Sequence, residues 1–149
     1  MTPRNQVIAQ TAYPLIVALK ADESSKEGKA LNKNYATLAH KLPAMILQNG
    51  LPQATGFLLA KSSSEHAHQI LLEHLITVFR NIDDDFKNIQ KIEDFHQKII
   101  DSNLTQVMRY TRESLEIAGW LRRYVQGVLK LDATGENEGE TNVKEGAKL

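Results

Sequence analysis

Apolar residues recur along most of the chain at intervals of three and four positions, and no segment alternates strictly between apolar and polar residues. This spacing predicts an all-α fold. The first helix is expected to take Thr2 as its N-cap and Pro3 as its first residue, and to kink at Pro14, where one backbone hydrogen bond is lost. The charged segment 22–30 is predicted to be a loop. The apolar face of the first helix is expected to comprise Ile8, Ala12, Leu15, Ile16 and Leu19.

The dipeptide Asn49-Gly50 joins two apolar runs, a pattern that is typical of β-hairpins when strands flank it. Here both flanks have helical spacing, which continues through Pro43 and begins again at Leu51. We therefore expect a helix bent at Pro43 and capped by Gly50, followed by a helix that Pro52 starts. The expected apolar faces comprise Leu31, Tyr35, Leu38, Ala39, Leu42, Met45 and Ile46, and then Leu51, Ala54 and Leu58.

Three further helices are predicted in the second half of the chain. Serines 62–64 are N-cap candidates for a helix that ends near Arg80, and the polar segment 81–88 is expected to be a loop. A short helix follows, and a long one runs from about Leu104 to Leu129. We therefore expect a compact bundle of about six helices with a long C-terminal helix. The apolar faces of the first two of these comprise Leu71, Leu72, Leu75, Ile76 and Phe79, and Ile92, Phe95, Ile99 and Ile100.

The composition is that of an ordinary globular protein, with 149 residues of which 42% are apolar. We predict one helical domain over 1–131. The segment 132–149 is rich in glycine and acidic residues and almost lacks apolar ones, and it is therefore predicted to be a disordered tail. The absence of cysteine excludes disulfides and thiolate metal sites. No segment resembles a signal peptide or a membrane span, so a cytoplasmic location without a membrane partner is expected.

The formal net charge of zero conceals an uneven distribution. The predicted tail carries five acidic residues and two lysines, a net charge of −3, which leaves the body with +3. Four of the six arginines lie between Arg109 and Arg123. Positive charge is therefore concentrated in the last predicted helix.

A helical projection of residues 104–130 separates an apolar side from a basic side. The basic side includes Arg112, Arg123 and Lys130, with Arg109 and Arg122 flanking them and Glu116 as the one acidic residue of the strip. From Arg112 to Lys130 it would extend about 27 Å. Guanidinium groups pair well with phosphates and release counterions, so this side could follow a nucleic-acid backbone. An ordinary solvated helix surface would show the same pattern.

The aromatic residues of this helix could in principle stack on bases. Tyr110, Trp120 and Tyr124 project toward the apolar side, so we expect them to pack in the core instead. The rest of the apolar side comprises Val107, Ile117, Ala118, Leu121, Val125 and Val128.

Two Glu-x-x-His units, Glu65 to His68 and Glu93 to His96, have the spacing of di-metal carboxylate sites in four-helix bundles. Such a site also needs inward carboxylates from two further helices, and the first two predicted helices have no acid in their apolar faces. The acidic run 83–85 lacks the ligand pattern of a calcium loop, and no nucleophile or phosphate-loop motif occurs. We therefore predict a binding protein without catalytic residues, metal or cofactor.

Two segments resemble a known family. Tyr35–Lys61, with its Leu-Pro-Ala and Asn-Gly-Leu strings followed by Gly-Phe-Leu-x-Ala-Lys, resembles the signature region of the small α-helical subunit of type III-B CRISPR effector complexes, the Cmr complexes. Thr111–Leu129 is similar to the C-terminal helix of the same family. The resemblance covers roughly residues 3–130, whereas Pro14 and the acidic tail depart from the family pattern.

The resemblance implies a helical protein without catalytic residues that assembles in several copies beside the backbone subunits of the complex. The copies would help to form the groove in which guide RNA and target RNA pair, while a different subunit cleaves the target. The expected RNA-binding residues are Lys41, Lys61, Arg112, Arg122 and Arg123, which match the family's motifs, and Arg109 and Lys130, which the helical projection alone adds.

The implied partners are therefore guide and target RNA, the other subunits of the complex and further copies of this chain. A body charge of +3 predicts that one copy binds RNA weakly and that affinity comes from several linked copies. Two alternatives stay open: a helical scaffold that contacts only proteins, and a di-metal bundle enzyme.

Overall fold

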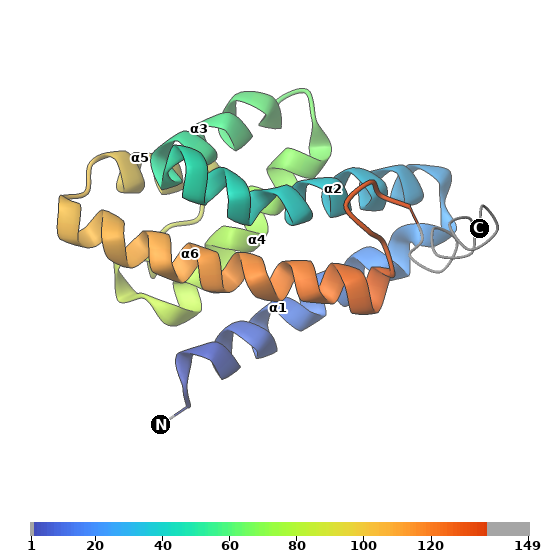
Figure 1. Cartoon of the computed structure of the whole chain (residues 1–149), viewed down its shortest axis with the longest axis horizontal. Helices are drawn as coiled ribbons and strands as arrows, with labels where there is room; N and C mark the ends of the chain where they lie inside the picture. Colours follow the sequence, from blue (N-terminus) through green and yellow to red (C-terminus); the bar gives the residue numbers. More distant parts are fainter. Residues whose placement is uncertain (1, 137–149) are drawn as a thin grey trace, which may run out of the picture.

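The computed structural model describes residues 2–136, which form the all-α bundle that the apolar spacing predicts. Figure 1 shows α6 running along the length of the molecule, with α3 and α5 at the end where α6 begins. None of the described helices is long and apolar enough to span a membrane. The helices are α1 (Arg4–Ala21), α2 (Lys26–Asn49), α3 (Leu51–Ser62), α4 (His66–Ile82), α5 (Ile92–Ile100) and α6 (Leu104–Tyr124), and a π-helical turn (Val125–Leu129) continues α6.

The start of α1 differs by one residue from the prediction. Pro3, not Thr2, is the N-cap, because its ψ of 145° is not helical and its carbonyl accepts the N–H of Gln6. Arg4 is therefore the first helical residue. The helix continues through Pro14, whose missing N–H interrupts the hydrogen-bond ladder at a single point.

The start of α2 lies earlier than predicted. The expected loop 22–30 is confined to a short 3-10 turn (Asp22–Ser24) and Ser25, the N-cap of α2. The Ser25 hydroxyl oxygen accepts the N–H of Gly28 at 2.9 Å, which satisfies one of the free donors of the first turn. Lys26 and its neighbours are polar, so apolar spacing could not reveal this turn.

The corner between α2 and α3 has the predicted form. α2 continues through Pro43 and ends at Gly50, whose φ of 87° suits glycine and disfavours other residues. The N–H of Gly50 donates to the carbonyl of Ile46 at 2.9 Å, and Pro52 lies in the first turn of α3. The Asn-Gly dipeptide therefore ends a helix and does not form a hairpin.

The start of α4 corrects a second capping prediction. Glu65 is the N-cap residue, and serines 62–64 do not cap the helix. The hydroxyl of Ser62 donates instead to the carbonyl of Leu59, at the C-terminal end of α3. α4 ends at Ile82, two residues beyond the expected end.

α6 begins where the sequence predicts, at Leu104. Asn103 and Gln106 form a capping box, in which each side chain accepts the backbone N–H of the other at 2.9 Å. The helix widens into the π-helical turn and stops at Lys130, which has the left-handed φ of 59°.

One continuous core draws apolar residues from all six helices. Tyr35 and His74 lie within it, with the Tyr35 hydroxyl 2.7 Å from His74 Nδ1. Burial lowers the pKa of His74 to about 4, so the imidazole is neutral at pH 7. Ile100, which was assigned to an apolar face, is 49% exposed. Near α4 and α6 the core contains the buried rings of Phe79, Phe86, Phe95 and Tyr110.

The first residues of the predicted tail turn back onto α2. The N–H of Asp132 donates to the carbonyl of Glu136 at 2.8 Å, and the Glu136 carboxylate lies 3.5 Å from Lys33 Nζ. Residues 132–136 therefore have a defined place in the structure. The remainder of the predicted disordered tail, 137–149, lies outside the described residues.

Candidate nucleic-acid interface

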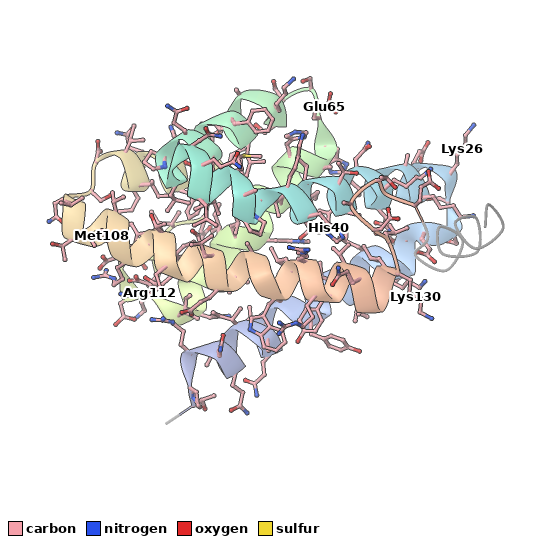
Figure 2. The ribbon with its side chains drawn as sticks, viewed as in Figure 1. Lys26, His40, Glu65, Met108, Arg112 and Lys130 are labelled. Carbon is pink, nitrogen blue, oxygen red and sulfur yellow. The ribbon has the colours of Figure 1, made fainter. Side chains whose placement is uncertain are left out.

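Four of the cations predicted to contact RNA are exposed on α6 or just beyond its π-helical turn. None of them forms an ion pair with another described residue. Figure 2 shows Arg112 in the first half of α6 and Lys130 just beyond its far end. We call these four residues the α6 cation strip: Arg112, Arg122, Arg123 and Lys130.

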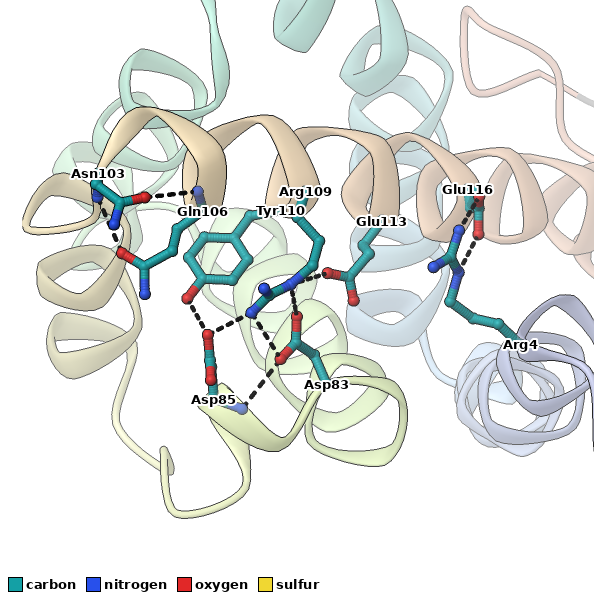
Figure 3. A network of polar contacts seen from close by, with 9 residues as sticks. All are labelled: Arg4, Asp83, Asp85, Asn103, Gln106, Arg109, Tyr110, Glu113 and Glu116. Carbon is teal, nitrogen blue, oxygen red and sulfur yellow. Dashed lines mark hydrogen bonds and ion pairs between the residues drawn. The ribbon is translucent and has the colours of Figure 1, made fainter.

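Glu116, the acidic residue of the basic side, is neutralised by a residue from α1. Arg4 Nε lies 2.8 Å from Glu116 Oε2, and Arg4 Nη2 lies 2.6 Å from Oε1, a bidentate pair (Figure 3). The pair removes the negative charge from the strip and places another guanidinium beside it. Sequence reasoning missed Arg4, because no local pattern links positions 112 residues apart.

The aromatic residues of α6 divide into one buried ring and two half-buried rings. Tyr110 is fully buried, as predicted. Trp120 and Tyr124 pack against the core as partly buried rings, as predicted, and also contact α1. Trp120 Nε1 donates to the Asn5 side chain at 3.2 Å, and the Tyr124 hydroxyl donates to the Ala9 carbonyl at 3.0 Å.

Arg123 lies over the exposed part of this aromatic surface. Its Cζ is 4.9 Å from the centre of the Trp120 ring, a cation–π contact that orients the guanidinium while leaving it accessible. The strip therefore contains one cation held in place by an aromatic ring.

Arg109 differs from the other predicted contacts, because its guanidinium is engaged by acidic residues of the same chain although its side chain is 40% exposed. Its Nε lies 3.0 Å from Asp83 Oδ2, and its Nη2 also pairs with Asp85 (Figure 3). The Tyr110 hydroxyl donates to the same Asp85 carboxylate at 2.6 Å. These contacts tie α6 to the connection after α4, so we leave Arg109 out of the proposed interface.

Glu113 lies beside this network, with its side chain 2% exposed. Burial, together with a hydrogen bond with Asp83, raises the pKa of Glu113 to about 8. Burial also acts to raise the pKa of Asp83, but hydrogen bonds from Glu113, Arg109 and the Asp85 N–H hold it below its usual value. At neutral pH the pair thus has one protonated carboxyl and one carboxylate, because two buried negative charges would repel. The sequence held one signal for this network: Glu113, an acidic residue on the core side of α6, lies one helical turn after Arg109.

Lys41 and Lys61 lie apart from the α6 cation strip. Both line a hollow of about 250 Å³ between α2, α3 and the start of α4, together with Phe57 and His68. No α6 residue lines this hollow. The predicted RNA-binding residues therefore fall into two exposed groups without ion pairs among the described residues, and Arg109, which is paired with Asp83 and Asp85.

The first half of α6 also has an exposed apolar surface. Leu104 and Met108 are 76% and 64% exposed. Met108 lines an open hollow of about 530 Å³ with Val107 and Leu115, and Arg112 lies at its edge. Exposed apolar area of this kind is typical of protein contacts.

The two Glu-x-x-His units do not converge on a metal site. His96 Nδ1 lies 2.8 Å from the Thr55 hydroxyl, and the His68 ring packs edge-on against Phe57. Among residues 2–136, no group of three histidine or acidic side chains is arranged to hold a metal ion.

Comparisons with known proteins agree with the family resemblance. The profile of the family described as "CRISPR-associated protein (Cas_Cmr5)" matches residues 4–128. A curated relative from Thermus thermophilus, named "CRISPR system Cmr subunit Cmr5", is 31% identical over 131 residues, which cover 87% of this chain and 99% of the relative. The X-ray structure of a CRISPR-associated Cmr5 family protein, also from Thermus thermophilus, has a TM-score of 0.67 and 30% identity, and the match covers 86% of this chain and 98% of that one.

Proposed function

The chain belongs to the Cmr5 family of CRISPR-associated proteins, and on that basis we propose that it is a non-catalytic, RNA-proximal subunit of a type III-B Cmr effector complex. Several copies stack beside the backbone subunits. Together they line part of the groove in which guide RNA and target RNA pair. Cleavage of the target belongs to another subunit.

The observation that carries this proposal is the α6 cation strip. Three of its side chains are exposed on α6 and the fourth lies just beyond the π-helical turn. None has an acidic partner among the described residues, and Arg4 neutralises the intervening Glu116. A strip made only for solubility would gain from alternating charges. A set of exposed cations whose one intervening acid is neutralised suits a polyanion.

The strip would recognise the RNA backbone without reading its sequence. Guanidinium groups form paired hydrogen bonds with phosphate oxygens, and each neutralised phosphate releases counterions. Sequence choice then lies in base pairing between guide and target. Lys41 and Lys61 are proposed as further phosphate contacts on a separate surface. Because each copy has few such contacts, binding depends on copies held side by side.

The exposed apolar surface of α6 favours a second candidate function, that of a scaffold which contacts only proteins. Met108 and Leu104 would be covered by a neighbouring subunit, and Arg112 would pair with an acidic residue of that subunit. In this case the strip would serve assembly.

Charge reversal in the assembled complex separates these two functions. In the double variant Arg112→Glu with Arg123→Glu, an RNA-contacting strip predicts a complex of normal composition that binds target RNA at least tenfold more weakly. A protein-contacting strip predicts that the variant fails to co-purify with the other subunits. Composition is measured by gel filtration and target binding by filter retention.

The matched control is the double variant Lys87→Glu with Lys91→Glu. These lysines are exposed near α5 and give the same change in net charge. Target binding that is normal in the Arg112 and Arg123 variant, or lost equally in the control, contradicts the proposal.

A further inference from the structure

A second group of lysines surrounds a hollow at the opposite end of the molecule from α5. The hollow has a volume of about 430 Å³, within the range of small-molecule clefts. It is lined by residues at the end of α1, in the first turns of α2 and from the end of the π-helical turn onward. Figure 1 shows the end of α1 and the start of α2 at the end of the molecule away from α5. We call it the lysine pocket, after Lys20, Lys29, Lys33 and Lys130.

The chain itself forms one wall of the lysine pocket. We call residues 131–136 the acidic strap. Its first residue is held to α2, because His40 Nε2 lies 3.3 Å from the Leu131 carbonyl oxygen. Its last residue places a carboxylate in the pocket, where Glu136 Oε1 lies 3.5 Å from Lys33 Nζ. An anion of this chain therefore already occupies part of the pocket.

Gly135 allows the acidic strap to lie close to α2. Its φ is 80°, and a Cβ atom added there would lie 2.9 Å from the carbonyl oxygen of Lys33. Any other residue would both strain the backbone and push the strap away. The position of Glu136 thus depends on the glycine beside it.

The pocket keeps an excess of positive charge with the strap in place. Lys20 pairs with Glu23 at 2.7 Å and Lys33 pairs with Glu136. Lys29 and Lys130 have no ion pair among the described residues. Four lysines against two glutamates give the pocket a formal charge of +2, and of +3 without Glu136.

We propose that the lysine pocket binds a phosphate of the RNA backbone and that Glu136 competes with this phosphate for Lys33. The inference rests on the proposed function, because it needs RNA beside α6. Lys130 belongs both to the α6 cation strip and to the pocket, so a backbone that follows the strip reaches the pocket directly. The family match ends at residue 128, before the acidic strap begins. The strap is therefore an addition to the matched domain that weakens RNA binding until several contacts displace it.

Two variants remove the competition in different ways. Glu136→Gln removes the carboxylate charge, and Gly135→Ala displaces the strap without any change in charge. Each is expected to tighten binding of a fluorescein-labelled 20-nucleotide polyuridine to the full chain about two- to five-fold, the range of one exposed ion pair. Binding is measured by fluorescence anisotropy at about 20 mM salt, where screening is weak.

Each variant has a matched control. Glu93→Gln gives the same charge change at an exposed position of α5, and Gly127→Ala adds a methyl group where no atom lies within 4 Å apart from the neighbouring backbone of its own helix. Both controls should bind as the wild type does. In a Lys33→Gln background, Glu136→Gln should not change the RNA affinity, because the ammonium group for which Glu136 and the phosphate compete is absent. Between 20 and 200 mM salt, Glu136→Gln should steepen the slope of log affinity against log salt by about 0.7, the value for one more phosphate on a single strand.

Three outcomes overturn the inference: unchanged affinity in both strap variants, an equal gain in Glu93→Gln, or no RNA binding by any full-length variant at low salt. The proposed function is tested separately, by the Arg112 and Arg123 variant in the assembled complex. If the Arg112 and Arg123 variant loses target binding while the two strap variants bind polyuridine as the wild type does, the proposed function is retained and the phosphate site in the lysine pocket is rejected.

Discussion

The protonated Glu113 makes the stability of the protein depend on pH, and Glu113→Gln should remove that dependence. Unfolded, this carboxyl has its ordinary pKa of 4.5, whereas burial raises the folded value to about 8. Between these values the folded chain keeps a proton that the unfolded chain has released. The free energy of unfolding therefore falls as pH rises, by about 1.4 kcal/mol per pH unit for one proton.

The pH dependence that Glu113 causes is best measured between pH 6.5 and 8.5. The folded pKa of His74 is about 4 against an ordinary 6.5, so its contribution to stability still rises by about 0.4 kcal/mol above pH 6.5, where half of the unfolded imidazoles are protonated. Burial also lowers the pKa of His68, which acts in the same direction. The histidine contributions are small in this window and are shared by wild type and variant, so Glu113 should lower the free energy of unfolding of the wild type by about 1–2 kcal/mol across it. Glutamine is neutral in both states and its amide can donate to Asp83 as the protonated acid does, so the variant should show no such fall.

The measurement is urea unfolding, followed by circular dichroism at pH 6.5, 7.5 and 8.5. It compares the wild type, Glu113→Gln and the control Glu93→Gln, at an exposed position of α5. The free energy of unfolding of the control should fall with pH as that of the wild type does, and the m-values should be unchanged. A flat wild-type profile, or a fall of equal size in Glu113→Gln, would refute the assignment of the proton to Glu113.

Two further substitutions test the fold. Gly50→Ala should destabilise the protein by about 1–3 kcal/mol in urea unfolding, because φ 87° and ψ 155° form a region that only glycine occupies easily; a change below 0.5 kcal/mol would contradict the strained corner. Tyr35→Phe should cost about 1–2 kcal/mol, because it leaves Nδ1 of His74 without its hydrogen-bond partner. The control Leu47→Ala, at an exposed position of α2, should change stability by less than that.

Most of the fold could be predicted from the sequence because helical periodicity reports which side of a helix is buried. The corner at Gly50 and the start of α6 at Leu104 followed from local chemistry, and both are confirmed. The N-caps of α1 and α4 were wrong, because several residues in each region could cap and tertiary packing decides among them. The early start of α2 was missed, since its first turn faces solvent.

The candidate site was less predictable. A helical projection shows which residues lie on the same side of α6, and it assigned Arg112 and Arg123 to the same side. It could not show that the loop after α4 carries Asp83 and Asp85 to Arg109, because that contact joins residues 24 to 26 positions apart through the fold. The same limitation hid Arg4, which reaches Glu116 from the other end of the chain.

The contacts of α1 with α6 have a consequence for biosynthesis. The pairs Arg4–Glu116, Asn5–Trp120 and Ala9–Tyr124 join positions 112 to 115 residues apart. A ribosome releases α1 long before α6. The face of α1 that contacts α6 therefore stays exposed to solvent while the intervening helices are synthesised. Closing so large a loop slows folding and lengthens the time in which chaperones can bind. A chain that stops before residue 104 leaves that face permanently exposed and is expected to aggregate.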